Sequence, residues 1–194
     1  MKVEDYDFSE FKDGNKALEA LIRLLQNAHA GEKAAANAYW GHARSLFVWS
    51  KKERSQITKI YEDELHHRKR LFEFLQSLNA QPRLLREIGM WCIGATIALL
   101  SIFGTWFIPM YGAGQLESTN IGEYEVAARL ALLAGREDLV AELLLFAEVE
   151  WDHEDFFRRK VENHWMTRFY PLWVKPSPRD SIQTSFSAFK TNNL

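Results

Sequence analysis

Apolar residues recur along most of the chain every three to four positions, and no segment alternates convincingly between apolar and polar residues. The first spacing lines one face of a helix, whereas alternation would indicate a strand. The pattern therefore predicts helices and almost nothing else. The four long segments that it predicts are about Asn15–Trp49, Ser50–Leu78, a third that starts after Pro82 and reaches about Ala134, and Asp138–His164.

The boundaries of these segments carry recognisable start and stop signals. Ser50-Lys51-Lys52-Glu53 has the form of a capping box, and Gly135 suits a C-terminal cap. We expect a break or kink in the third segment between Pro109 and Gly114, because proline removes a helical hydrogen bond. Four long helices with short connections favour an all-α, antiparallel four-helix bundle.

The two ends of the chain lack this pattern. We expect residues 1–14 to form an N-terminal extension, 15–168 the helical bundle and 169–194 a C-terminal tail. Three prolines in the tail indicate the end of regular helix, namely Pro171, Pro176 and Pro178. The aromatic residues expected to pack the tail are Trp173, Phe186 and Phe189.

The third segment contains 29 consecutive residues, Ile88–Leu116, without Asp, Glu, Lys, Arg or His. Such a run is typical of a transmembrane helix or of a core helix buried on all sides. We favour a helix that packs in the bundle on one side and enters one membrane leaflet on the other. Pro109 and glycines that include Gly89, Gly94, Gly104 and Gly112 interrupt the run, and Trp91 and Trp106 suit an interface. Exposed apolar surface could equally be a contact between copies of the chain.

Composition excludes several classes of protein. The chain has 24 Lys and Arg against 26 Asp and Glu, a formal net charge of −2, which gives no electrostatic reason to expect nucleic acid as a partner. The acidic N-terminus is not a secretory signal, so we expect the chain to stay in the reducing compartment where it is made. Its only cysteine, Cys92, excludes an intrachain disulfide and a cysteine-based metal site. We expect Cys92 to be a buried small apolar residue.

A repeated arrangement of glutamate, tyrosine and histidine carries the candidate chemistry. The first copy consists of Glu32, Tyr39 seven residues later, and Glu64-Leu65-His66-His67, which begins 32 residues after Glu32. The second consists of Glu117, Tyr124 seven residues later, and Glu150-Trp151-Asp152-His153, which begins 33 residues after Glu117. The spacing within E-x-x-H puts a carboxylate and an imidazole on one helical face. Each copy spans a predicted helix–helix turn, so its first glutamate should face its E-x-x-H.

Four glutamates and two histidines in a bundle core would be costly without a partner that neutralises them. Two divalent metal ions would do so, and this donor set is that of di-iron carboxylate bundles. Carboxylates with one imidazole per metal suit iron or manganese better than zinc. We expect Glu32 and His67 at one metal, Glu117 and His153 at the other, and Glu64 and Glu150 as bridges. Glu123 and Glu125 are alternatives to Glu117, and salt-bridged surface faces are the alternative for the whole set.

At these residues the sequence resembles the demethoxyubiquinone hydroxylases, which are ferritin-like di-iron monooxygenases of ubiquinone biosynthesis. The resemblance covers roughly residues 25–158 and rests on His29-Ala30-Gly31-Glu32 with Tyr39, Glu64–His67, Leu116-Glu117-Ser118 with Tyr124, and Glu150–His153. It implies a ferritin-like fold, two iron ions and hydroxylation of a lipophilic quinone ring with O2, with NADH as the ultimate electron donor. It also implies that the apolar stretch before Glu117 associates with a membrane and admits the quinone.

The chain also departs from that family. Glu123 stands where the family usually has a histidine before the tyrosine, and the tail after Trp165 is unlike the family's. The expected location is the cytoplasm, peripheral on the inner face of the cell membrane, as a homo-oligomer or in a biosynthetic complex. Alternatives are a ferritin-like di-iron oxygenase or oxidase with another substrate, an iron-binding protein, and a non-catalytic quinone-binding partner.

Other polar residues have less specific interpretations. Tyr39 and Tyr124 could bond to the metal ligands or relay protons and electrons, or could be core tyrosines with satisfied hydroxyls. His29 and His66 could support neighbouring ligands. We expect His42 and His164 to be structural, and the basic runs to be solvated helix faces that lipid headgroups could contact. These runs are Arg68-Lys69-Arg70 and Arg158-Arg159-Lys160.

Overall fold

The computed structural model describes residues 3–11 and 13–193, and within these ranges it contains helices and no strand. The α-helices are α1 (Gly14–His42), α2 (Lys51–Ser77), α3 (Leu84–Phe103), α4 (Phe107–Leu133), α5 (Glu137–Val161) and α6 (Ser181–Asn193). The short 3-10 helices are η1 (Val3–Asp5), η2 (Phe8–Phe11) and η3 (Trp165–Arg168). The prediction of an all-α chain is confirmed. Residues 1, 2, 12 and 194 of the expected extension and tail lie outside the described residues.

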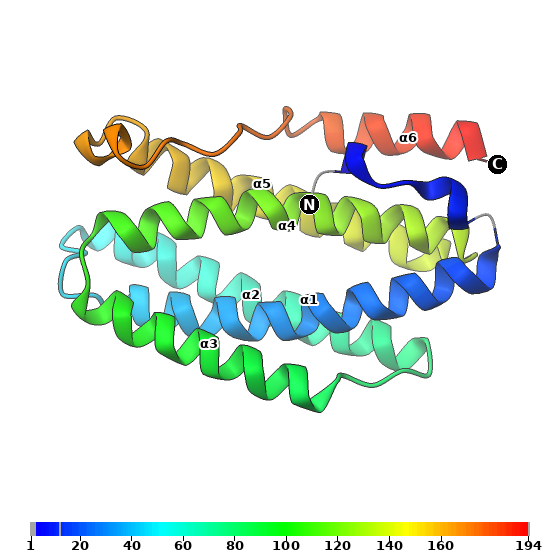
Figure 1. Ribbon diagram of the computed structural model, residues 1–194, viewed down its shortest axis with the longest axis horizontal. Helices are drawn as coiled ribbons and strands as arrows, with labels where there is room; N and C mark the ends of the chain where they lie inside the picture. The colour runs from blue at the N-terminus through cyan, green and yellow to red at the C-terminus, as the bar shows by residue number, and fades with distance from the viewer. Residues whose placement is uncertain (1–2, 12, 194) are drawn as a thin grey trace. The chain divides into compact units, whose positions relative to one another are not determined.

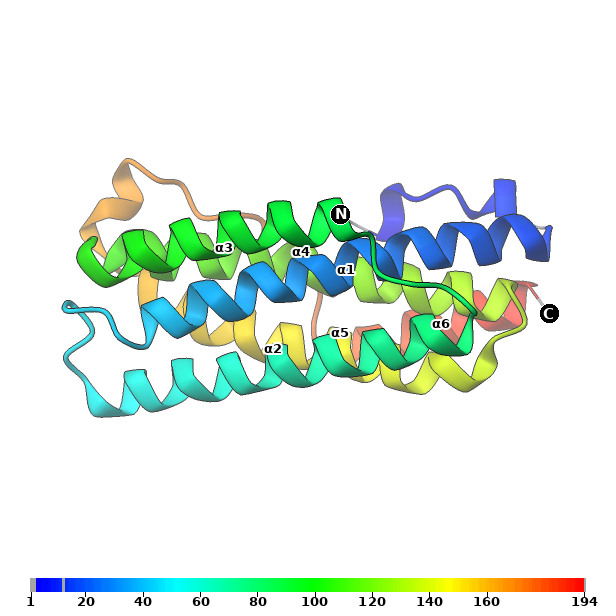
Figure 2. The same cartoon turned by 90° about the horizontal axis from the view of Figure 1, so that it is seen from below.

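The chain divides into two compact units. The first, here called the α1–α3 unit, spans Leu25–Met110 and contains most of α1 with α2 and α3. The second, here called the α4–α6 unit, spans Met1–Leu24 and Tyr111–Leu194. In the first unit α2 runs antiparallel to α1, and α3 returns in the direction of α1 (Figures 1 and 2). In the second, α5 runs antiparallel to α4, and α6 packs against α5.

The predicted caps define the hairpin turns. Ser50 caps α2, and its hydroxyl accepts a hydrogen bond from the backbone N–H of Glu53 at 3.3 Å. Gly135 has a φ of 69°, and the following N–H of Arg136 donates to the carbonyl of Ala131 at 2.8 Å, which closes α4 in a Schellman motif. Asn79, with a φ of 53°, ends α2 in the same way.

Two predicted helix boundaries are wrong. The first helix ends at His42 rather than near Trp49, and residues 43–50 form a loop. The break in the apolar segment lies between Phe103 and Phe107, at Gly104, rather than between Pro109 and Gly114. Proline is tolerated in the first turn of a helix, where backbone N–H groups have no intrahelical acceptor. Pro109 therefore lies inside the start of α4 without interrupting it.

Regular helix does not end at the tail prolines, because α6 follows them. Ile182 and Phe186 of α6 are buried. Phe189 packs edge-on against Phe8 with ring centroids 5.0 Å apart. Before α6, the indole N–H of Trp173 donates to a carboxylate oxygen of Glu154 at 2.6 Å. The tail thus packs through the three aromatic residues expected, and half of it is helical.

Helix α3 packs closely on α1 through small residues and leaves its apolar remainder exposed. A Cβ on Gly94 would lie 2.6 Å from Cα of Ala34, and a Cβ on Gly41 would lie 2.4 Å from Cα of Ala98. Among the described residues α3 is the one helix long and apolar enough to cross a membrane, and only 17% of its most apolar window is buried. The prediction that Cys92 is buried is wrong, since it lies exposed on this helix.

Candidate metal centre

In the α1–α3 unit, Glu32 of α1 meets Glu64 and His67 of α2. One ligand atom from each of these residues lies within 4.8 Å of the others. All three side chains are buried, and Glu64 is 0% exposed. The hairpin formed by α1 and α2 therefore brings the first glutamate to its E-x-x-H, as the spacing predicts. We call this group the first triad.

In the α4–α6 unit, Glu117 of α4 meets Glu150 and His153 of α5. Their ligand atoms again lie within 4.8 Å of one another, and both glutamates are 0% exposed. His153 Nδ1 lies 3.6 Å from Glu150 Oε2. Asn120, one turn beyond Glu117, donates from Nδ2 to Glu117 Oε2 at 2.9 Å and so orients that carboxylate. We call this group the second triad.

The donor chemistry of both triads fits a metal ion. Each offers two carboxylates and one imidazole, which is a donor set suited to iron or manganese. Burying two carboxylates beside one imidazole without a cation would carry a large desolvation cost. Each unit therefore contains a buried cluster of acidic and histidine side chains that could hold a metal ion.

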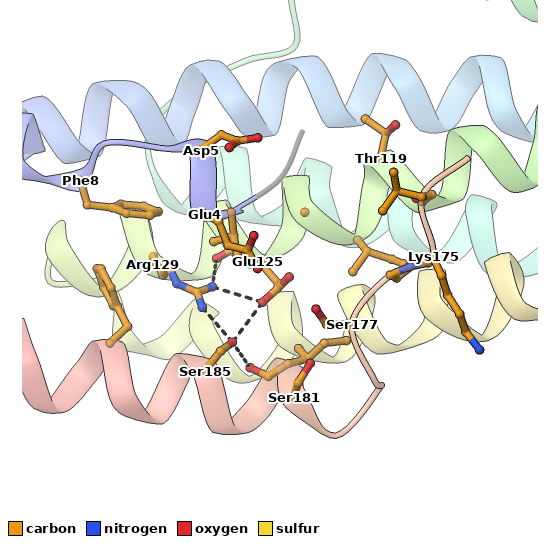
Figure 3. Close-up of a pocket in the computed structure, with 18 residues that line it drawn as sticks. Glu4, Asp5, Phe8, Thr119, Glu125, Arg129, Lys175, Ser177, Ser181 and Ser185 are labelled. Carbon is orange, nitrogen blue, oxygen red and sulfur yellow. Dashed lines mark hydrogen bonds and ion pairs between the residues drawn. The ribbon is translucent and has the colours of Figure 1, made fainter. Parts of the chain in front are cut away.

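The alternative ligands on α4 have other surroundings. Glu125 lies at a separate pocket of about 1010 Å³ between α4, α6 and η1, together with Arg129 and Ser185 (Figure 3). Arg129 lies 3.5 Å from the Glu125 carboxylate and donates to Ser185 Oγ at 3.0 Å. Burial raises the pKa of Glu125 against the opposing effects of Arg129 and Ser185. Glu123 is only partly buried, so of the three glutamates considered Glu117 is the one in the triad.

A partly buried polar network adjoins the first triad. Glu87, in the first turn of α3, accepts hydrogen bonds from His29 Nδ1 at 2.7 Å and from Arg68 at 2.6 Å. His29 lies one turn before Glu32, and Arg68 follows His67 directly. Burial lowers the pKa of His29, whereas the hydrogen bond to Glu87 opposes that effect. Burial acts to raise the pKa of Glu87, but the bonds from Arg68 and His29 outweigh it and lower the pKa.

A different network adjoins the second triad. Glu154, which follows His153, accepts hydrogen bonds from Arg158 Nε at 2.7 Å and from the Trp173 indole at 2.6 Å. The Arg158 guanidinium also lies 4.8 Å from the centre of the Trp173 ring. The expectation that Arg158 belongs to a solvated helix face is wrong, because it is buried. Its neighbour Arg159 is exposed, as expected.

The remaining candidates are distributed between core and surface. Tyr39 and Tyr124 are both buried, and Tyr124 packs edge-on against Phe146 at 5.3 Å. His42 is buried away from either triad, and burial lowers its pKa to about 4. His66 is exposed.

Sequence patterns did not identify the residues that support the triads. Asn120 and Glu154 carry no signal beyond their position one turn from, or next to, a motif residue, and Glu87 lacks even that. Asn120 lies one helical turn from Glu117, and Glu154 is next to His153. This spacing could have identified both as candidates for contact with the ligands. Glu87 is distant in sequence from both of its partners, so only the tertiary structure reveals its role.

No known protein family model, curated protein or solved structure matches this chain. The functional interpretation of the two triads therefore depends on their geometry and on the motifs that they contain.

Proposed function

We propose that this protein is a ferritin-like di-iron oxygenase that hydroxylates the ring of a lipophilic, demethoxyubiquinone-type quinone with O2. The observation that carries the proposal is the occurrence of the same buried triad, one glutamate with an E-x-x-H, in both units of the chain. One such cluster could be a local accident of packing. Two with matched spacing and matched burial favour a centre that holds two metal ions.

The six triad residues have distinct roles in this proposal. Glu32 and His67 would hold one iron, Glu117 and His153 the other, and Glu64 and Glu150 would bridge the two. Bound iron would supply the redox chemistry that O2 activation requires, with NADH as the ultimate source of electrons. The side chains that bury the carboxylates would keep water away from the reacting atoms, and the Asn120 amide restrains Glu117. Tyr39 and Tyr124 are buried groups in the two units that could pass a proton toward the ligands.

The exposed apolar side of α3 supports the proposal that the substrate is lipophilic. Leu99, Leu100 and Phe103 are 58%, 65% and 64% exposed. Large apolar patches on a folded protein mark contacts with membranes, partners or apolar ligands. A peripheral position on the inner face of the cell membrane would bring α3 to the lipid phase in which a long-chain quinone dissolves. The alternative function of iron storage, in a shell with polar outer faces, does not explain the exposed apolar side chains of α3.

A second candidate is the same oxygen chemistry on another lipophilic substrate. Glu123 stands at the position where the hydroxylases usually have a histidine. The packed tail with α6 is a further difference from the family's expected pattern. Either could alter the substrate while leaving the triads unchanged.

Iron loading and turnover test the proposal together. The full chain, purified without oxygen and supplied with Fe²⁺, is expected to bind about two irons per chain. Addition of O2, a reductant and a demethoxyquinone should then yield the ring-hydroxylated quinone. A protein that binds no iron contradicts the metal centre. A protein that binds two irons and consumes O2 without hydroxylating the quinone contradicts the substrate and favours the second candidate.

A further inference from the structure

The loop between α1 and α2, residues 43–50, holds large apolar side chains in solvent. Trp49 is 85% exposed, Leu46 61% and Phe47 42%. The indole N–H of Trp49 donates to the carbonyl of Leu46 at 2.7 Å. Because this bond satisfies the one polar atom of the indole, the exposed part of Trp49 is apolar. Large exposed apolar side chains in a cluster mark contact sites.

This loop is held in place from inside. The Arg54 guanidinium of α2 donates hydrogen bonds to the carbonyls of Ala43, Ser45 and Val48. Val48 is fully buried. Three loop carbonyls thus bind one cation, and a buried valine anchors the middle of the loop. The Arg54 hydrogen bonds and the buried Val48 therefore hold the loop in a conformation that exposes Trp49.

The loop is continuous with the exposed side of α3. The backbone N–H of Leu46 donates to the carbonyl of Ile102 at 3.1 Å. Leu100 and Phe103, on either side of Ile102, are more than half exposed. One apolar surface therefore extends from the end of α3 onto the loop.

Positive charge lies beside this apolar surface, in the loop and at the start of α2. The sequence has no Asp or Glu between Glu32 and Glu53, whereas Arg44, Lys51 and Lys52 are exposed. A surface hollow of about 450 Å³ begins at Lys51 on the first turns of α2. Its lining comprises Lys51, Arg54, Ser55, Thr58, Lys59 and Glu62. Ammonium groups and hydroxyls are donors suited to phosphate oxygens.

We propose that this loop, together with the first three turns of α2, is a docking site for the surface of an anionic phospholipid bilayer. Trp49, Leu46 and Phe47 enter the interfacial layer, where aromatic side chains are favoured. Lys51, Lys52 and Lys59 bind the headgroup phosphates, which attract basic residues next to a membrane. A symmetric contact between two copies is disfavoured, because it would bring the same cations together.

The docking site is separate from the oxygen chemistry. It involves neither triad and requires no metal, so it can be tested on the metal-free full chain. It also differs from contact through the uncharged part of α3, residues 88–103, which should not distinguish anionic from neutral lipid. Failure of one proposal therefore leaves the other open to its own test.

Vesicle flotation measures the docking. The full chain is mixed with vesicles of phosphatidylcholine alone or with about one third phosphatidylglycerol, at low salt, where surface attraction is greatest. We expect tighter binding to the anionic vesicles. The triple variant Lys51→Gln, Lys52→Gln and Lys59→Gln should lose roughly fivefold in affinity per lysine, on the order of a hundredfold in total, for the anionic vesicles only. Trp49→Ser should weaken binding to both kinds by about tenfold or more.

Matched variants elsewhere provide the controls. Lys16, Lys69 and Lys175 are exposed and lie outside the loop and the hollow, so changing all three to Gln removes the same charge. Trp165, 64% exposed, provides the control for Trp49. Equal losses in the two lysine triples, or none in either, overturn the proposal. A Trp49→Ser variant that lowers the mass in sedimentation but leaves vesicle binding unchanged overturns it too, in favour of a contact between copies.

Discussion

The two triads use the same residue types at nearly the same spacing, 32 and 33 residues, but the side chains around them differ. Beside the second triad, Glu154 is 1% exposed at its side chain and binds Arg158 and the tail indole of Trp173. Beside the first, Glu87 is 15% exposed at its side chain and joins three helices through His29 and Arg68. The ligands repeat, whereas their support does not.

This difference follows from the segments that cover the helices of each unit. In the α4–α6 unit a folded tail lies on α5, so its network is closed and buried. In the α1–α3 unit the outer helix is α3, which exposes most of its apolar residues. The network beside the second triad is therefore covered by the tail of its own unit, whereas the first triad belongs to a unit whose α3 is largely exposed.

The largest expected effect comes from changing one central carboxylate in each triad. Glu64→Gln and Glu150→Gln each remove a buried negative charge and leave an amide that cannot bridge two metals. We expect each to reduce quinone hydroxylation about a thousandfold or more, roughly 4 kcal/mol in the barrier, and to lower the iron bound per chain. Product formation and metal counting on the purified variants provide the measurements.

Equal losses in this pair would indicate that the two triads act as one centre. Glu62→Gln is the control, because Glu62 is an exposed glutamate on α2 two residues from Glu64. If only one of the paired variants loses activity, the two triads are not equivalent halves, and the proposed bridging roles are wrong.

The next largest effect is a difference in stability between variants of the two networks, that of Glu154 beside the second triad and that of Glu87 beside the first. Arg158→Met leaves the Glu154 carboxylate buried without its cation, and such a loss costs about 3–5 kcal/mol of unfolding free energy. Arg68→Met leaves Glu87 with His29 and with some access to water, so we expect a smaller loss of about 1–3 kcal/mol. Urea unfolding of the metal-free proteins measures both.

A double variant isolates the charge in the buried network. Arg158→Met combined with Glu154→Gln removes both charges and keeps an acceptor for the Trp173 indole. It should be more stable than Arg158→Met alone. Equal stability of the Arg158→Met and Arg68→Met proteins would contradict the distinction between a closed and an open network.

The triads could be predicted because each depends on local rules. Helical spacing places Glu64 with His67 and Glu150 with His153, and a short antiparallel hairpin brings the preceding glutamate opposite. The turns at Ser50 and Gly135 also follow from local signals. Secondary structure and the candidate ligands therefore came from patterns within about thirty-five residues.

What the sequence did not predict depends on contacts between distant segments. The apolar run does not tell whether α3 is buried, so the exposure of Cys92 was missed. Arg158 reads as one of three basic residues until Trp173 and Glu154 surround it. The packing that buries Ile182 in α6 is likewise invisible to local propensity, because tertiary contacts rather than propensity stabilise most helices in proteins.

The smallest expected effect is an opposite response of the two units to acid. Burial lowers the pKa of His42 in the α1–α3 unit from 6.5 to about 4, against the opposing charge of Glu53. Its contribution to stability is therefore present above about pH 6.5 and lost as the pH falls toward 4, since only the unfolded chain takes up the proton. Burial raises the pKa of Glu125 in the α4–α6 unit. The contribution of Glu125 to stability is therefore present at low pH, where the carboxyl group is protonated in both states. It is lost as the pH rises, because the unfolded chain releases the proton more readily than the folded one.

His42→Gln tests this contrast through the slope of stability with pH rather than through stability itself. Between about pH 7.5 and about pH 5, linkage predicts that His42 accounts for a loss of about 2 kcal/mol in unfolding free energy, and the variant should lack that part of the loss. Urea unfolding at both pH values gives the slope, with His66→Gln as the exposed control on α2. Hydrogen exchange at the lower pH should show α1 near His42 losing protection before α4 near Glu125. If the slope is the same in His42→Gln and in the unchanged protein, the buried imidazole is not what makes the α1–α3 unit sensitive to acid.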